Sequence, residues 1–164
     1  TVSFVQGGPQ LPASITVDSL GSWTDFVGDE YKAFSGTAVY TTTINKVPVA
    51  DVIKLDLGSV AENASVYLNG DYIGTVIDSP YQLYIPAEKF KGQDELVVRV
   101  ANSMANRIAY MDKKGVDWKI FYNVNMSARK KENVKNGIFD ASDWEPKSSG
   151  LLGPVTLTPA MVKQ

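Results

Sequence analysis

A tight turn between two alternating runs is the feature that most constrains how this chain can fold. Asn69-Gly70 separates residues 64–68 from residues 71–76, and both runs alternate apolar and polar side chains. Asn and Gly best tolerate the positive φ angles of a type I′ turn, whose twist matches that of two paired strands. The sequence therefore predicts a β-hairpin over residues 64–76, and its neighbours must supply the rest of a sheet.

Further strand signals lie on both sides of this hairpin. They cover residues 39–44, 51–57, 81–85, 95–101 and 155–157. In 51–57 the odd-numbered residues, such as Leu55, form the apolar face, and in 95–101 the even-numbered residues, such as Val98, do so. Helical signals are weak, with a single turn expected at residues 87–90. Short strands separated by turns indicate an all-β, antiparallel sandwich.

One long segment interrupts the strand pattern. The alternation largely stops between Ser103 and Gly150, and so long a connection is unusual in a compact domain unless it has a function or is disordered. The segment is rich in aromatic residues, which argues against plain disorder. Residues 120–126 could add one more strand. We therefore expect a sandwich with a long, aromatic-rich insertion.

The residue types that are missing exclude several kinds of chemistry. The chain has no His and no Cys, so it cannot carry a Ser/His/Asp triad, a thiolate nucleophile or a disulfide framework. Its formal net charge of −2 offers no basic face for nucleic acid. No apolar run is long enough to cross a membrane. The first residue is Thr1 rather than Met, so we expect a piece of a longer protein.

Several stretches, taken in order, resemble one family. They are Thr1-Val2-Ser3-Phe4 with Gly7-Gly8-Pro9 and Leu20-Gly21-Ser22-Trp23-Thr24; Phe34-Ser35-Gly36-Thr37-Ala38-Val39-Tyr40; Leu55-Asp56-Leu57-Gly58-Ser59-Val60-Ala61-Glu62-Asn63-Ala64 with Val66-Tyr67-Leu68-Asn69-Gly70; and Val100-Ala101-Asn102, Asn106-Arg107-Ile108 and Ser149-Gly150-Leu151-Leu152-Gly153-Pro154-Val155. This pattern resembles the C-terminal β-sandwich of bacterial α-L-rhamnosidases of glycoside hydrolase family 106. It is similar, more loosely, to the sugar-binding domains of β-galactosidase-type enzymes.

The resemblance implies a jelly roll of the galactose-binding-like fold, with residues 1–164 as one accessory domain cut from a larger glycoside hydrolase. In such enzymes the catalytic carboxylates lie on a separate barrel that this chain lacks, so no catalytic residue is carried over. The resemblance also implies export from a bacterial cell and a catalytic domain as partner. No cofactor is expected, although such domains often hold a structural calcium ion, for which the sequence assigns no ligands.

Candidate sugar-binding residues lie in the long insertion. Aromatic rings offer a flat surface to the apolar face of a sugar, and amide or guanidinium groups bind its hydroxyls. The residues that fit this description are Trp118, Tyr110, Tyr122, Trp144, Asn106 and Arg107. The alternative is that the rings anchor the insertion to the sandwich or pack against the absent catalytic domain.

Two pairs of acidic residues in the insertion, Asp112 with Asp117 and Asp140 with Asp143, raise the question of catalysis. A glycosidase needs two carboxylates about 5–10 Å apart, but acids this close in sequence are common on surfaces and in loops. The leading hypothesis is a non-catalytic accessory domain. The alternatives are an autonomous carbohydrate-binding module or lectin-like domain, and, least favoured, a small independent enzyme.

Overall fold

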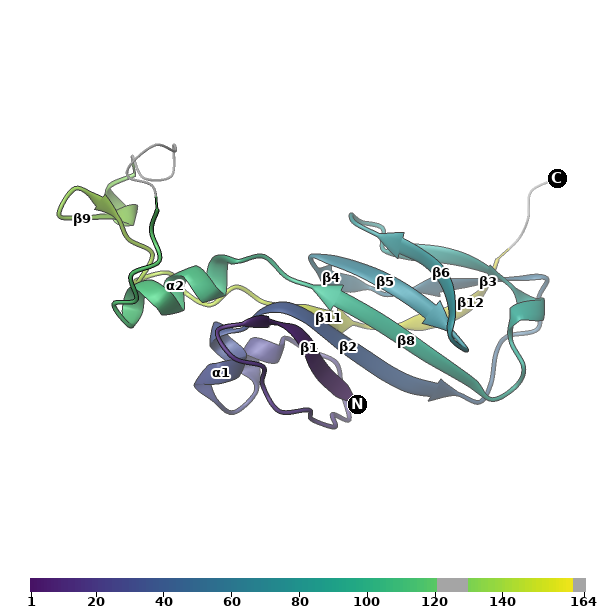
Figure 1. Cartoon of the computed structure of the whole chain (residues 1–164). Helices are drawn as coiled ribbons and strands as arrows, with labels where there is room; N and C mark the ends of the chain where they lie inside the picture. The colour runs from purple at the N-terminus through teal and green to yellow at the C-terminus, as the bar shows by residue number, and fades with distance from the viewer. Residues whose placement is uncertain (121–129, 161–164) are drawn as a thin grey trace.

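In the computed structural model, residues 1–120 and 130–160 are described, and they form an antiparallel β-sandwich of jelly-roll type (Figure 1). The larger sheet has five strands in the order β1 (Val2–Gly8), β2 (Ser35–Ile44), β8 (Asp94–Ala101), β5 (Asn63–Leu68) and β6 (Asp71–Val76). A second sheet has the order β12 (Thr156–Ala160), β3 (Val52–Asp56) and β7 (Gln82–Pro86), and β11 (Gly150–Gly153) pairs with β4 (Ser59–Ala61).

The core lies between the sheets, on the faces that the alternation predicts. Ile53 and Leu55 of β3 are fully buried, and Val98 of β8 is 2% exposed. At the end of the sandwich near α1 (Asp29–Ala33), aromatic rings pack edge to face: Phe4 lies 5.6 Å from Trp23 and 5.0 Å from Phe34, centroid to centroid. This rigid end is the part of the sandwich from which the long insertion leaves.

The predicted hairpin is confirmed. Asn69 and Gly70 have φ angles of 52° and 86°, as the turn requires, and they join β5 to β6. The Asn69 side chain also fixes the turn to the neighbouring strand β8. It donates to the buried Asp94 carboxylate at 2.7 Å and accepts the Glu95 N–H at 3.0 Å. The turn thus holds three strands in register rather than two.

The other predicted strands are present, and their bounds differ from the predicted ones by one to four residues. The strand expected at residues 155–157 extends to Ala160 through Pro159, which the sheet tolerates because β12 is an edge strand that need not donate there. The single turn expected at 87–90 is a 3₁₀ turn, η2 (Ala87–Lys89). The strand β1 and the helices α1 and α2 (Ala105–Lys113) were not predicted.

The segment between β8 and β11 is more ordered than a plain loop. It contains α2, the 3₁₀ turn η4 (Lys131–Asn133) and the short strands β9 (Val134–Lys135) and β10 (Ile138–Phe139). We call the described part of residues 103–149 the insertion lobe; it extends from one end of the sandwich (Figure 1). Of the strand suggested at residues 120–126, residues 121–126 lie outside the described ranges.

The insertion lobe has a small hydrophobic core of its own. Phe139 and Ala141 are buried, and Ile108, Trp118 and Trp144 pack against them. The Phe139 ring meets both tryptophans edge to face, at centroid distances of 6.5 Å from Trp118 and 5.8 Å from Trp144. The lobe is therefore a packed unit attached to the sandwich.

Candidate functional site

A cleft of about 780 Å³ lies between the sandwich end and the insertion lobe. Its walls come from α1, α2 and the segment that follows β10. The residues that line it include Lys32, Asn106, Tyr110, Lys135, Asp140 and Trp144. Charged groups and two aromatic rings thus face one space, which suits a polar ligand with apolar patches.

A lysine bound by two carboxylates forms one wall of the cleft. The Lys135 ammonium lies 3.3 Å from Asp140 and 3.1 Å from Asp143. Ser142 links to the same group, because its hydroxyl accepts from Lys135 and donates to Asp140, both at 2.5 Å. Lys135 lies on β9 and its partners follow β10, so the network closes the small β9–β10 hairpin.

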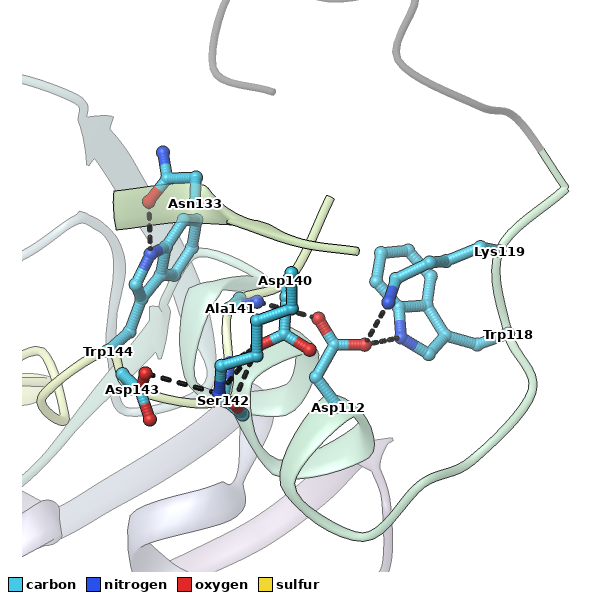
Figure 2. Close-up of polar contacts among 10 residues, drawn as sticks. Asp112, Trp118, Lys119, Asn133, Asp140, Ala141, Ser142, Asp143 and Trp144 are labelled. Carbon is cyan, nitrogen blue, oxygen red and sulfur yellow. Dashed lines mark hydrogen bonds and ion pairs between the residues drawn. The ribbon is translucent and has the colours of Figure 1, made fainter. Parts of the chain in front are cut away.

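A second carboxylate network is centred on Asp112, which also lines the cleft (Figure 2). The Asp112 side chain, only 1% exposed, accepts from the Trp118 indole N–H and from the Ala141 backbone N–H, both at 2.7 Å. Lys119 lies 2.7 Å from the same carboxylate. One buried acid therefore ties the end of α2 to the rest of the lobe, and its hydrogen-bonding capacity is taken up internally.

The predicted aromatic site residues do not form one platform. Tyr110 and Trp144 line the cleft, and the Lys114 ammonium lies 5.7 Å from the centre of the Tyr110 ring. Trp118 is half-buried against Phe139 and does not line the cleft. The Trp144 indole donates to Asn133 at 2.9 Å, so this ring is both a wall and an anchor. Tyr122 lies outside the described residues.

The two predicted polar residues sit on α2 and have different surroundings. Asn106 is buried, and its amide binds both the N–H and the carbonyl of Lys147, at 2.8 and 2.9 Å, which fixes the cleft's floor to the chain returning to β11. The Arg107 backbone N–H donates to Ser35, and its guanidinium lies against Gly8. Arg107 does not line the cleft.

Sequence reasoning missed the contribution of α1 to the cleft. Lys32 and Asp29 line it, although more than seventy residues separate them from Asn106 along the chain. Only the tertiary fold brings α1 and α2 together, and no local motif marks either residue. The pairing of Asp140 with Asp143 was visible in the sequence, but the bridging role of Lys135 was not.

The surroundings of Asp140 favour the ionised form of its carboxyl. Burial alone would raise the pKa of Asp140, but hydrogen bonds from Ser142 and the charge of Lys135 outweigh it and hold that pKa below its usual value. The hydrogen bond to Asp143 is the main reason that the pKa of Lys135 is raised. A glycosidase acid needs the opposite, a carboxyl whose pKa is raised so that it keeps its proton.

The described residues include no group of three or more His, Cys, Asp or Glu side chains close enough to hold a metal ion, and the structural calcium ion stays a prediction. Among the same residues, no helix has the length and apolar composition needed to cross a bilayer.

Comparison with known proteins finds similarity to parts of glycoside hydrolases. No protein-family model matches it. A protein of Formosa agariphila named "Putative beta-glucuronidase" is 34% identical over 158 residues, which are 87% of this chain and 14% of that protein. A solved rhamnosidase from Novosphingobium sp. PP1Y is 30% identical with a TM-score of 0.74, over 95% of this chain and 14% of the rhamnosidase.

A solved FMN-binding beta-glucuronidase from Facaelibacterium prausnitzii L2-6 is 18% identical with a TM-score of 0.50, which indicates a shared fold only; the match covers 95% of this chain and 20% of that one. The chain thus spans about one seventh of the length of the first two relatives. In sequence and in fold, it is related to one segment of larger glycoside hydrolases.

Proposed function

We propose that residues 1–164 are a single, non-catalytic accessory domain of a larger bacterial glycoside hydrolase of the α-L-rhamnosidase type, family 106. The observation that carries this proposal is the match to a rhamnosidase over 95% of this chain but only 14% of that enzyme. The domain would stabilise the catalytic domain through the insertion lobe. We also propose that the enzyme is exported and acts on polysaccharide outside the cytoplasm.

The state of the acidic residues supports a role without catalysis. Asp140 and Asp143 share the Lys135 ammonium, and Asp112 accepts two hydrogen bonds and an ion pair inside the lobe. Carboxylates held in this way cannot readily donate a proton to a glycosidic oxygen. The lobe instead offers packed, rigid surface, which is what docking onto a second domain requires.

Deleting residues 1–164 from the full-length protein tests the proposal. We expect the truncated enzyme to lose several degrees of melting temperature and much of its soluble yield, because the catalytic domain would expose its docking surface. The isolated chain should not hydrolyse aryl rhamnosides or glucuronides. A truncated enzyme with unchanged stability and activity would contradict the scaffold role, and hydrolysis by the isolated chain would contradict the non-catalytic one.

A second function, carbohydrate binding, is favoured by the cleft. Tyr110 and Trp144 lie in its walls beside charged groups, and Trp144 was a predicted sugar contact. Calorimetric titration of the isolated domain with rhamnose-containing oligosaccharides would test this. Binding that disappears in Trp144→Ala, but persists in Trp118→Ala, would assign the cleft as a sugar site, since Trp118 does not line it.

A further inference from the structure

The outer face of the five-stranded sheet carries a group of side chains that neither the core nor the cleft uses. On β5, Ser65 and Tyr67 alternate with buried residues and point away from the core. The register places Tyr67 between Val97 of β8 and Tyr72 of β6, and it places Ser65 between Arg99 and Thr75. Figure 1 shows β5, β6 and β8 side by side in one layer.

The two tyrosines and two hydroxyls of this face are linked to one another. The rings of Tyr67 and Tyr72 meet edge to face with centroids 5.5 Å apart. The Thr75 hydroxyl lies 2.8 Å from the Tyr72 hydroxyl and 2.7 Å from that of Ser65. Tyr72 nevertheless remains 58% exposed. The rings are therefore positioned by neighbours while one of them stays open to a ligand, at little further cost in side-chain entropy.

Arg99 supplies a positive charge beside these rings. It is exposed on the same face, and no ion pair or hydrogen bond of its guanidinium occurs within residues 1–120 and 130–160. A guanidinium binds a carboxylate through two parallel hydrogen bonds, which gives both affinity and a fixed geometry. The face thus combines aromatic surface, a chain of hydroxyls and the Arg99 cation, and Glu95 lies on the same face of β8 four residues before Arg99.

We propose that this face, defined by Tyr67, Tyr72, Arg99, Ser65 and Thr75, binds an acidic polysaccharide chain, one that carries uronate carboxylates. The rings would pack on the apolar faces of the sugars, the hydroxyls would exchange hydrogen bonds with theirs, and Arg99 would pair with a carboxylate. The inference rests on the proposed function as part of a carbohydrate-active enzyme, but it concerns a surface distinct from the insertion lobe.

The composition of the face favours a sugar chain over a macromolecule of another class. Nucleic acid would need several cations to neutralise its closely spaced phosphates, whereas this face has one arginine. Serine is depleted at protein–protein interfaces, so the hydroxyl-rich part of this face favours a sugar over a protein partner. The row from Thr41 of β2 to Tyr72 of β6 spans three strand spacings, about 14 Å, enough for a short stretch of polysaccharide.

The test is affinity electrophoresis and calorimetry of the complete chain with two probes, polygalacturonate and a neutral xylan. We expect polygalacturonate to retard the wild type more than xylan does, and added NaCl to reduce that difference. Tyr72→Ala should weaken binding on the order of tenfold, while Tyr72→Phe should retain most of it. Arg99→Gln should abolish the preference for the acidic probe.

The matched control is Tyr84→Ala. Tyr84 is 62% exposed on the outer face of the other sheet, so its loss removes a comparable ring without touching the proposed site. Circular dichroism would verify that each variant is folded. Equal binding by wild type and Tyr72→Ala would overturn the proposal, and so would binding lost only in Trp144→Ala, which would place the sugar in the cleft.

Two further outcomes also count against the proposal. Failure of both polymers to bind would contradict the proposed sugar site on this face. It would leave the accessory role intact, since that role is tested by deleting residues 1–164 from the full-length enzyme. Self-association of the chain that is abolished by Tyr72→Ala would instead make this face a contact between protein copies.

Discussion

At the scale of single residues, Asp94 shows how one buried acid organises a turn. Its carboxylate accepts from the Asn69 side chain and from the Lys91 backbone N–H, both at 2.7 Å, and from the Gly92 N–H at 3.1 Å. Burial alone would raise the pKa of Asp94, but these hydrogen bonds outweigh it and hold the pKa below its usual value. The ionised form therefore stabilises the fold.

This arrangement predicts a defined pH dependence for Asp94→Asn. A carboxyl whose pKa is lower in the folded state stabilises the protein above its unfolded pKa of about 3.9, and this contribution is lost as the pH falls through the folded pKa. We expect the variant to be less stable by about 1–3 kcal/mol at pH 7. The difference from wild type should shrink below about pH 4. Urea unfolding at several pH values measures both effects, and a difference that does not change with pH would contradict them.

Gly150 is a second residue whose identity the fold dictates. Its φ of +109° disfavours any side chain, and an added Cβ would lie 2.8 Å from Trp23 Cε3 and in contact with the Tyr40 hydroxyl. Gly150→Ala should therefore lose about 3 kcal/mol of stability, from backbone strain and from overpacking together.

Gly92→Ala is the matched control for this substitution. Gly92 has a similar φ of +97° but open space around it, so its replacement should cost only about 1 kcal/mol. Thermal unfolding of both variants separates the two contributions. Equal losses of stability in the two variants would show that the contact of residue 150 with Trp23 and Tyr40 does not contribute to the stability difference.

At the scale of elements, the strands with a strong local signal were predictable and the helices were not. The hairpin β5–β6 follows from Asn69-Gly70, and β8 follows from an apolar alternation that runs through Val98. The helix α2 is only nine residues long and its one buried residue, Asn106, is polar, so no apolar run marks it in the sequence. Its stability comes from tertiary contacts, such as Asn106 with Lys147, that a local pattern does not show.

The sequence predicted which types of residue form the candidate site, but not which of these residues come together. Aromatic and polar residues in the insertion suggested a ligand site, and Tyr110, Asn106 and Trp144 do meet at the cleft. The sequence did not show that Trp118 packs on Phe139 instead, because the two residues are brought together by a chain reversal with no motif. Lys32 joins the cleft from α1 for the same reason.

The core of the insertion lobe gives a prediction at this scale. Phe139 is 6% exposed and lies between two tryptophans, so Phe139→Ala should loosen the lobe while the sandwich stays folded. We expect limited proteolysis between residues 104 and 148 to become on the order of tenfold faster, with near-unchanged unfolding of the sandwich. Ile138→Ala, at a position 42% exposed, is the control. Equal protection of Phe139→Ala and wild type would contradict a packed lobe.

At the scale of the whole molecule, the two ends of the insertion lobe are held together by the sandwich. Asn102 donates to the Ser149 hydroxyl at 2.9 Å, and Ser149 is itself bound through its backbone to Ser22 and Trp23. Asn102 also accepts the Gly36 N–H at 2.8 Å. Ser149 is therefore held mainly by residues of the sandwich, and Asn106 of α2 adds one hydrogen bond to the Ser149 hydroxyl at 3.3 Å.

Replacing residues 104–147 by a short Gly/Ser linker tests whether the sandwich folds without the lobe. The ends are already close, and a shorter connection costs less loop entropy, so the sandwich should fold with a melting temperature within about 5 °C of wild type. Near-ultraviolet circular dichroism of the buried Trp23 would report native packing. A variant that is insoluble or lacks this signal would show instead that lobe and sandwich fold as one cooperative unit.

The clamp between Asn102 and Ser149 has a consequence for how such proteins diversify. Because hydrogen bonds hold Asn102 and Ser149 together, the sandwich can accept segments of many lengths between them without a shift in the register of any strand. We expect homologous chains to differ in length between these two residues more than anywhere else. The same position would serve protein engineers as a site for grafting a foreign loop or for opening new chain termini.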